Sequence, residues 1–391
     1  MNNILLITPL YPLPTKENRI TPVCHFFARD WTKMGYNVIS IHLQPVHCGL
    51  WHLAVKIRGR NGSLTSYPKK LHKTEHYVMD DVPVFRIPIY QTTPHFEFTD
   101  KSVHVFAEEV KKELDKINFK PDIIVGHSMA PHIIPVLNEY YKVKTVMVAH
   151  GAGRQIRKLK NWEEIVDSYD AWGFRAEPIQ KRFEQNAKKV RNSFICYSGI
   201  PEAFVATEPR SNFNQPLKRF VFVGSLFPNK YPIALLKAIP RVYNDFSIEI
   251  IGDGPDLEML KEYVVNNGLK EHVSFVGKIS REEVVKHLDY SDCFIMISGP
   301  EAFGLSYMEA MARGCITIGS KGQGIDGVIV DGENGFLCEV GNDEELTSIL
   351  KKISNMDTQK VIEIAKNGYN TAKIMTDPEM ARDYMNKLER V

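Results

Sequence analysis

The stretch Cys293–Ile318 reads CFIMISGPEAFGLSYMEAMARGCITI and contains one complete unit of the fold. An apolar run, Cys293–Ile297, leads into Gly299-Pro300 and a helix-forming segment, and a second apolar run, Cys315–Ile318, follows. Short apolar runs are typical of strands in a parallel sheet that helices cover on both faces. The stretch therefore predicts a strand–helix–strand unit, with the residues after the first strand at the carboxyl edge of the sheet.

The same alternation extends along the 391 residues in two series. The first predicts strands at Ile4–Ile7, Val38–Leu43, Val84–Ile89, Ile123–Val125 and Thr145–Ala149, and helices at Val23–Met34 and Lys101–Ile117. The second predicts strands at Phe220–Val223, Ile248–Ile251, Val273–Val276, Cys293–Ile297 and Cys315–Ile318. A polar stretch, Thr207–Gln215, is interpreted as a linker. We therefore expect an α/β protein of two Rossmann-like, doubly wound domains, residues 1–205 and 216–376, facing a central cleft.

The composition is that of a soluble globular protein, with 43% hydrophobic and 25% charged residues. No apolar run approaches the roughly 20 residues of a membrane-spanning helix, and the start, MNNILLITPLYP, does not resemble a signal peptide. The six cysteines form no C-x-x-C pair, and several lie in apolar runs. We therefore expect reduced core thiols in a cytosolic protein rather than a zinc site or disulfides.

The net charge of +2 conceals an asymmetry between the two halves. Residues 1–200 carry 28 Lys and Arg against 19 Asp and Glu, whereas residues 201–391 carry 21 against 28. No acidic residue lies between Asp30 and Glu75, or between Glu139 and Glu163. Such runs are most often solvated surface, but they also suit an anionic partner such as nucleic acid or the inner leaflet of a membrane.

In the second series, groups suited to a phosphate follow the predicted strands. The loop after Phe220–Val223 presents Ser225 and Lys230 before a helix, and a hydroxyl, an ammonium group and a helix N-terminus together suit a diphosphate. Gly254 and Gly277 follow the next two strands, where glycine serves either a close backbone approach or a tight turn.

The strongest signal is the segment from Glu301 to Glu309, EAFGLSYME. Gly299-Pro300 places Glu301 in a loop before the helix, whereas Glu309 lies inside the helix. Free backbone N–H groups near Gly304 can bind a phosphate, and two carboxylates can hold two vicinal diols, a ribose and a hexose. Two Glu at this spacing alone would more often be surface residues.

The order of these segments resembles that of the retaining glycosyltransferases of family 4, which have the GT-B fold. The resemblance covers most of residues 216–355 and includes a further segment, Lys321–Phe336. It implies that Lys230 neutralises the diphosphate of a nucleotide-sugar donor, Glu301 holds hydroxyls of the transferred sugar, and Glu309 holds the ribose. It also implies that the terminal helix, 377–391, returns to the first domain. It further implies that Gly277, Lys278 and Ile279 run along the nucleotide base and that Gly304, Leu305 and Ser306 supply backbone N–H groups. Ser225, Gly254 and Phe303 complete our list of candidate donor-binding residues.

Two histidines follow strands of the first series at parallel positions, His127 after Ile123–Val125 and His150 after Thr145–Ala149. A lone histidine in such a position is more often structural, but the pair favours a site. The resemblance implies that His127 lies beside the donor sugar, as a third catalytic residue with Lys230 and Glu301, and that His150 lines the cleft.

Two positions depart from the family pattern. Ser225 stands where many members have Arg, and the first loop lacks the Gly-Gly pair that approaches the diphosphate in relatives. Arg19 is our candidate for the positive charge that is missing at Ser225. We expect Arg19 and Thr21 to lie on the acceptor side of the cleft. Residues 45–80, which include Trp51 and Tyr67, have no clear family counterpart and are expected to form the acceptor side.

The resemblance implies transfer of a hexose from a nucleotide-diphosphate sugar, a UDP-sugar rather than a GDP-sugar, to a glycan or lipid-linked glycan in surface polysaccharide synthesis. We expect no cofactor and no metal, because no two Asp are separated by one residue. The alternatives are a GT-B sugar-nucleotide epimerase and a non-catalytic sugar-nucleotide-binding subunit. A dehydrogenase is disfavoured, because no G-x-G-x-x-G follows Ile4–Ile7. We expect a cytoplasmic enzyme, peripheral on the inner face of the cell membrane, with no nucleic-acid partner.

Overall fold

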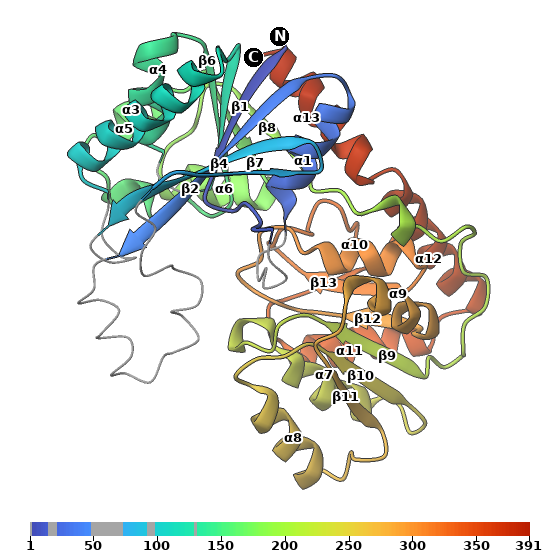
Figure 1. The fold of residues 1–391 in the computed structure, drawn as a ribbon. Coiled ribbons are helices and arrows are strands. Elements are labelled where there is room, and N and C mark those ends of the chain that lie inside the picture. Colours follow the sequence, from blue (N-terminus) through green and yellow to red (C-terminus); the bar gives the residue numbers. More distant parts are fainter. Residues whose placement is uncertain (1, 15–21, 48–72, 92–97, 129–130) are drawn as a thin grey trace. The chain divides into compact units, whose positions relative to one another are not determined.

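The computed structural model describes residues 2–14, 22–47, 73–91, 98–128 and 131–391. The chain divides into two compact units. Unit 1 comprises Met1–Arg175, Ile179–Cys196 and Met380–Val391, and unit 2 comprises Ala176–Pro178 and Tyr197–Glu379. Each unit has its own mostly parallel sheet with helices on both faces (Figure 1), so the predicted α/β class with two doubly wound sheets is confirmed.

The described strands of unit 1 form a sheet in the order β3-β4-β2-β1-β5-β6-β7-β8. All neighbours are parallel except β3 and β4, which are antiparallel. The strands are β1 (Asn3–Thr8), β2 (Asn37–His47), β3 (Glu75–Met79), β4 (Val82–Gln91), β5 (Ile123–His127), β6 (Lys144–Ala149), β7 (Ala171–Phe174) and β8 (Ser193–Ile195).

The five strands predicted for the first series are present, whereas β3, β7 and β8 were not predicted. β3 is an edge strand whose side chains are exposed or half-buried, so it lacks the apolar run that marks a central strand. β7 and β8 are too short for the apolar pattern to separate them from a loop.

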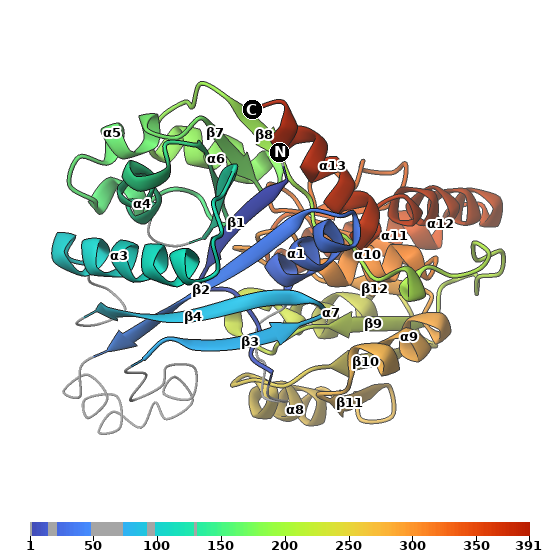
Figure 2. The same ribbon diagram turned by 45° about the horizontal axis from the view of Figure 1, so that its top comes forward.

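The helices of unit 1 lie on both faces of its sheet. Figure 1 and Figure 2 show α1 and α13 on one face, and α3 and α4 on the other. The helices that lie wholly or mainly in this unit are α1 (Val23–Lys33), α3 (Asp100–Lys116), α4 (Ile133–Tyr141), α5 (Trp162–Asp167), α6 (Glu177–Asn186) and α13 (Asp377–Glu389), with a 3-10 turn η2 (Ile156–Lys158).

The C-terminal helix α13 is part of the core of unit 1. Tyr384 and Leu388 are buried in one cluster with Phe27 and Trp31 of α1, because residues three or four apart lie on the same side of a helix. The indole N–H of Trp31 donates to the carbonyl oxygen of Ala381 at 2.9 Å. The last turns of the chain therefore complete a core that begins at β1.

Unit 2 has a fully parallel sheet in the order β11-β10-β9-β12-β13-β14. Its strands are β9 (Arg219–Val223), β10 (Ser247–Ile251), β11 (Val273–Gly277), β12 (Cys293–Ile295), β13 (Ile316–Ser320) and β14 (Phe336–Cys338). The predicted strands are all present, but β12 ends two residues earlier than expected and β13 is shifted towards the C-terminus. The short strand β14 was not predicted.

The helices of unit 2 cover both faces of its sheet, with α7, α8 and α11 on one face and α9, α10 and α12 on the other (Figure 1). They are α7 (Pro232–Ala238), α8 (Leu257–Asn266), α9 (Arg281–Tyr290), α10 (Leu305–Ala312), α11 (Asp343–Ser354) and α12 (Thr358–Lys373), with the 3-10 turns η3 (Glu202–Phe204), η4 (Pro228–Lys230) and η5 (Ile239–Arg241). Across the described ranges of both units, every helix is too short or too polar to span a membrane.

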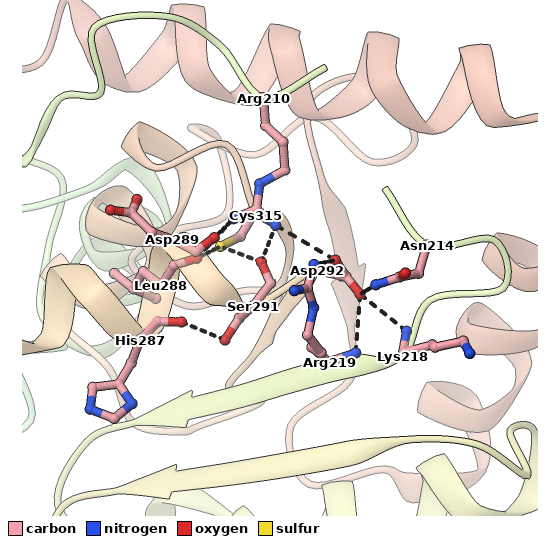
Figure 3. Close-up of polar contacts among 10 residues, drawn as sticks. All are labelled: Arg210, Asn214, Lys218, Arg219, His287, Leu288, Asp289, Ser291, Asp292 and Cys315. Atoms are coloured by element: carbon pink, nitrogen blue, oxygen red, sulfur yellow. Dashed lines mark hydrogen bonds and ion pairs between the residues drawn. The ribbon is translucent and has the colours of Figure 1, made fainter. Parts of the chain in front are cut away.

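The segment interpreted as a linker, Thr207–Gln215, is part of unit 2 and is hydrogen-bonded to it. Figure 3 shows the Arg210 guanidinium on the carbonyl oxygens of Leu288, Asp289 and Ser291. Asn214 donates to the buried carboxylate of Asp292 at 2.8 Å. The sequence did not reveal these bonds, because a polar, proline-containing stretch has the same composition whether it is free or held by a distant acceptor.

Candidate functional site

The loops at the carboxyl edge of the unit 2 sheet are hydrogen-bonded to one another. The N–H of Leu226, after β9, donates to the Asp253 carbonyl at 3.0 Å, and that of Gly252, after β10, donates to the Gly277 carbonyl at 2.9 Å. Gly254 is required by packing, because a Cβ atom there would lie 2.4 Å from the carbonyl oxygen of Leu226. Ser225 stays exposed between these loops.

Lys230 and Glu301 meet at this edge as an ion pair. Lys230 ends the turn η4 after β9, and Glu301 lies in the loop after β12, so residues 71 apart in the sequence come together. The two loops are joined directly, since the N–H of Gly299 donates to the carbonyl of Asn229 at 2.9 Å. The structure thus places the predicted cation and the predicted sugar-binding carboxylate in contact.

The loop that carries Glu301 is held in place from three directions. The N–H of Glu301 donates to the Gln323 side-chain oxygen at 3.0 Å, and the carbonyl of Glu301 accepts from the N–H of Gly324 at 3.1 Å. The Ser298 hydroxyl lies 3.4 Å from its carboxylate and 3.2 Å from the Tyr307 hydroxyl. Sequence reasoning missed Ser298 and Gln323; their positions in the loops that follow β12 and β13 were the signal that could have revealed them.

The N-terminus of α10 lies beside Glu301. Gly304 caps this helix with φ +84°, and a Cβ atom there would lie 2.4 Å from the Tyr307 ring and 3.4 Å from Cγ of Glu301. Leu305 and Ser306 open the helix and are half-buried. Backbone N–H groups in the first turn of a helix have no acceptor within the helix and attract anions. The N-terminus of α10 therefore lies next to the Glu301 side chain, whose carboxylate pairs with Lys230.

The other predicted donor-site residues occupy different environments. Phe303 is buried, and its ring centroid lies 5.6 Å from that of Tyr197, so it packs inside unit 2. After β11, Lys278 is exposed and Ile279 is half-buried. Glu309 is buried in α10, where its carboxylate accepts from Arg281 at 2.7 Å. Sequence reasoning also missed Arg281.

In unit 1, His127 and His150 form a hydrogen-bonded row with Tyr384 of α13. His127 Nδ1 lies 3.0 Å from His150 Nε2, and His127 Nε2 lies 3.1 Å from the Tyr384 hydroxyl. His127 is buried, whereas His150 is half-buried. Both ring nitrogens of His127 are thus engaged by protein groups, and His150 is the more accessible of the two rings.

Burial and charge keep the two imidazoles neutral. Burial, with His150 and Arg175 nearby, lowers the pKa of His127 well below its ordinary value. Burial and Arg175 lower the pKa of His150 to about 3. Burial raises the pKa of Tyr384, so its hydroxyl keeps its proton, and His127 is its one acceptor among the described residues. Tyr384 then donates to Nε2 of His127, His127 donates from Nδ1 to Nε2 of His150, and His150 carries its own proton on Nδ1.

Cys24 joins the two histidines in a cluster whose ligand atoms all lie within 4.8 Å of one another. Sequence spacing could not reveal it, because the three residues lie on separate elements. Burial raises the pKa of the Cys24 thiol to about 11, and its Sγ lies 3.6 Å from the Thr8 hydroxyl. A protonated thiol, a fully hydrogen-bonded imidazole and the positive charge of Arg175 are unfavourable for a metal cation.

Several predicted positions lie outside the described residues. These are Arg19 and Thr21 in the first loop, and Trp51 and Tyr67 with the basic residues around them. The five described cysteines are free and buried, as expected for core thiols.

The family described as "Glycosyl transferases group 1" matches residues 206–371, nearly all of unit 2. An uncharacterised glycosyltransferase of Methanocaldococcus jannaschii is 33% identical over 327 residues, which cover 74% of this chain and 80% of that protein. The N-acetyl-alpha-D-glucosaminyl L-malate synthase of Bacillus anthracis is 39% identical over 109 residues, 28% of each chain.

Among solved structures, Anabaena HepE in complex with UDP matches all of both chains, with a TM-score of 0.71 and 16% identity. Two of the first curated relatives are matched over only 52% and 28% of their own lengths. The M. jannaschii relative is matched over most of its length, and the structural match has the same arrangement of two parallel α/β sheets. The chain therefore belongs to the glycosyl transferases group 1 family, glycosyltransferase family 4, and has the GT-B fold.

Proposed function

We propose that this chain is a retaining glycosyltransferase that moves a hexose from a nucleotide-diphosphate sugar to a hydroxyl of a glycan or lipid-linked glycan. The observation that carries the proposal is the meeting of Lys230, Glu301 and the N-terminus of α10 at one edge of the unit 2 sheet. That edge combines an ammonium group and free N–H groups for a diphosphate with a carboxylate that accepts bonds from sugar hydroxyls.

A UDP-sugar is the donor that we favour. The support is the likeness to HepE, whose structures are described in complex with UDP and with UDP-glucose. In this proposal the loop Gly277–Ile279 runs along the base, Glu309 binds the ribose, and Ser225 lies near the diphosphate, as the family resemblance implies. Tighter binding of GDP than of UDP would overturn this choice of base and leave the transferase proposal standing.

Donor binding exchanges one partner of Lys230 for another. Lys230 and Glu301 are paired, and their side chains are 19% and 14% exposed. A diphosphate that reaches Lys230 takes the place of the Glu301 carboxylate, because both anions compete for the same ammonium protons. Glu301 is then released to accept hydrogen bonds from the sugar. Binding of the phosphate end and of the sugar end is coupled through this exchange.

The transfer step breaks the bond between the anomeric carbon and the diphosphate oxygen and forms a bond from that carbon to the acceptor oxygen on the same face. The departing phosphate oxygen takes the acceptor proton. Lys230 and the N–H groups of α10 stabilise the negative charge that develops on the leaving diphosphate. We place no covalent intermediate on Glu301, and we assign the His127–His150 row to the positioning of substrate rather than to nucleophilic attack.

The lipid-linked acceptor is proposed from the charge of unit 1. Arg154, Arg157, Lys158 and Lys160 are all exposed, and none of them has an ion-pair partner among the described residues. Each basic residue near an anionic leaflet contributes on the order of 1 kcal/mol of attraction. We propose that this segment, together with the basic residues of 48–73, holds the enzyme at the cytoplasmic face of a membrane that carries the acceptor.

Vesicle flotation tests the membrane proposal. Binding should rise with anionic lipid content, fall as salt screens the charges, and drop when Arg157, Lys158 and Lys160 become Glu. If equal amounts of the protein floated with neutral and with anionic vesicles, the membrane proposal would be contradicted, and the transferase proposal would remain.

Nucleotide release from a panel of UDP- and GDP-sugars tests the reaction. Release that increases with a glycan acceptor supports a transferase. Lys230→Ala should abolish this release, and Glu301→Gln should lower it. Lys237→Ala is the matched control, because Lys237 lies on α7 of the same unit and its ammonium is 3.7 Å from Asp343. An epimerised sugar nucleotide formed without acceptor would show an epimerase, and binding without turnover would show a binding subunit.

A further inference from the structure

Glu309 is a buried carboxylate with a single described partner, Arg281. The side chain lies inside α10, and the residue is only 4% exposed. Its Oε1 atom accepts from Nε of Arg281 at 2.7 Å and also contacts Nη2 of the same guanidinium. A carboxylate taken out of water needs such compensation to be tolerated.

Arg281 is the first residue of α9, and the capped start of this helix fixes its backbone. Ser280 caps this helix, because its hydroxyl accepts from the N–H of Glu283 at 3.2 Å while the Glu283 carboxylate accepts from the N–H of Ser280 at 2.9 Å. The guanidinium carbon lies 5.1 Å from the ring centroid of Phe204. Helix α9 follows directly on the loop Gly277–Ile279, so Arg281 links that loop to Glu309.

Two of the three guanidinium nitrogens lie at the same carboxylate oxygen: Nε of Arg281 donates to Oε1 of Glu309, and Nη2 forms an ion pair with that oxygen. No described residue donates to the other oxygen, Oε2 of Glu309. The carboxylate is therefore fixed by one oxygen and open at the other, which is the arrangement needed to accept hydrogen bonds from hydroxyl groups of a ligand.

We propose that Arg281 is a positioning residue for the nucleotide: it orients Glu309 so that Oε2 accepts the ribose hydroxyls. This rests on the proposed function, in which Glu309 holds the ribose. Arg281 acts through Glu309 and makes no bond of its own to the nucleotide in this proposal. The ligand class is a ribonucleoside diphosphate with both hydroxyls free.

Calorimetric titration with UDP and with 2′,3′-dideoxy-UDP tests the proposal, because the second ligand lacks the groups that Glu309 would bind. Arg281→Met should weaken UDP binding roughly tenfold to a hundredfold. It should leave the weaker binding of dideoxy-UDP unchanged. Arg281→Lys should fall between the parent and Arg281→Met, since an ammonium keeps the charge but not the fork of two N–H groups.

Two further variants complete the design. Adding Arg281→Met to Glu309→Gln should cost no further UDP affinity, because the two residues act as one unit. Arg241→Met is the matched control, since Arg241 pairs with Asp343 at 3.2 Å in the same unit. It should bind both ligands as the parent does.

The possible results distinguish the role of Arg281 from the assignment of Glu309 to the ribose. Equal weakening of UDP and dideoxy-UDP by Arg281→Met, or by Arg281→Lys if the Met variant does not fold, would overturn the role of Arg281. The role of Arg281 would also be overturned if Arg281→Met bound UDP as the parent does while Glu309→Gln bound it more weakly. In that case the assignment of Glu309 to the ribose would still stand. Parent-like UDP binding by Glu309→Gln would overturn both the ribose assignment and the role of Arg281.

Discussion

Replacing Asp292 should destabilise unit 2 and leave unit 1 intact. Asp292 is fully buried just before β12, and its carboxylate accepts from the N–H groups of Lys218 and Arg219, both at 3.1 Å. It also accepts from the Asn214 amide at 2.8 Å and from Nη2 of Arg219 at 2.9 Å (Figure 3). The carboxylate thus ties the segment before β9 to the start of β12, the two strands whose loops carry Lys230 and Glu301.

The expected loss in the free energy of unfolding follows from the number of donor groups that lose their acceptor. In Asp292→Ala, the backbone N–H groups of Lys218 and Arg219 lose their acceptor, and so do the Asn214 amide and Nη2 of Arg219. Removing one partner of a buried ion pair costs about 3–5 kcal/mol. Asp292→Asn keeps one oxygen and should cost about 1.5–3 kcal/mol. Asp289→Ala is the matched control, because Asp289 pairs with Arg313 at a half-exposed position and should cost about 0–1 kcal/mol.

The assay uses the distribution of tryptophan. All four Trp, at positions 31, 51, 162 and 172, lie in the first half of the sequence. In urea titrations, Trp fluorescence therefore reports unit 1, whereas far-UV circular dichroism reports both units. Asp292→Ala should shift a circular dichroism transition and leave the fluorescence transition in place. A circular dichroism shift no larger than that of Asp289→Ala would refute the reasoning.

The same carboxylate predicts a pH dependence. Burial opposes its ionisation, but hydrogen bonds from Arg219, Asn214 and the Lys218 N–H outweigh burial and lower the pKa of Asp292. A lowered pKa in the folded state gives stability that is present above the unfolded value of about 3.9 and is lost as the pH falls through the folded value. The stability difference between the parent and Asp292→Asn should therefore shrink below about pH 4.

Four further predictions concern the candidate site and the stability of unit 1. Transferase activity should survive excess EDTA and be lost in Lys230→Ala, and activity restored to the EDTA-treated enzyme only by Mg²⁺ or Mn²⁺ would contradict the metal-free mechanism. Glu301→Gln should lower kcat more than UDP affinity, because the carboxylate is proposed to touch the sugar and not the nucleotide; an equal loss in a UDP titration would count against this. Tyr384→Phe should cost unit 1 about 1–3 kcal/mol in a fluorescence-monitored urea titration, because it leaves the buried Nε2 of His127 without its donor. As the pH falls from about 6.5, where an unfolded histidine begins to gain protons, towards 3, the lowered pKa of His150 should also make unit 1 progressively less stable.

Local sequence was enough to locate most strands and the loops after them. Most central strands of both sheets are short runs dominated by apolar residues, because a strand covered on both faces buries most of its side chains. Parallel strands share one carboxyl edge, so the placement of Lys230 and Glu301 in loops after β9 and β12 already implied that they would lie on the same side of one sheet. The edge strand β3 lacks such a run, and β7, β8 and β14 are too short for their composition to distinguish them from loops.

By itself, the sequence determined the α/β class, the two parallel sheets and the order of the motifs that mark the family, because these depend on residues within one strand–helix unit. Only the tertiary structure decided which side chains are partners. Arg281 and Glu309 are 28 residues apart, Lys230 and Glu301 are 71 apart, and His127 and Tyr384 are 257 apart. No local pattern relates such residues, since a charged or polar side chain has the same sequence context whether it faces water or a distant partner. Contact between them depends on how strands are ordered in each sheet and on where α13 packs, and those are properties of the folded chain.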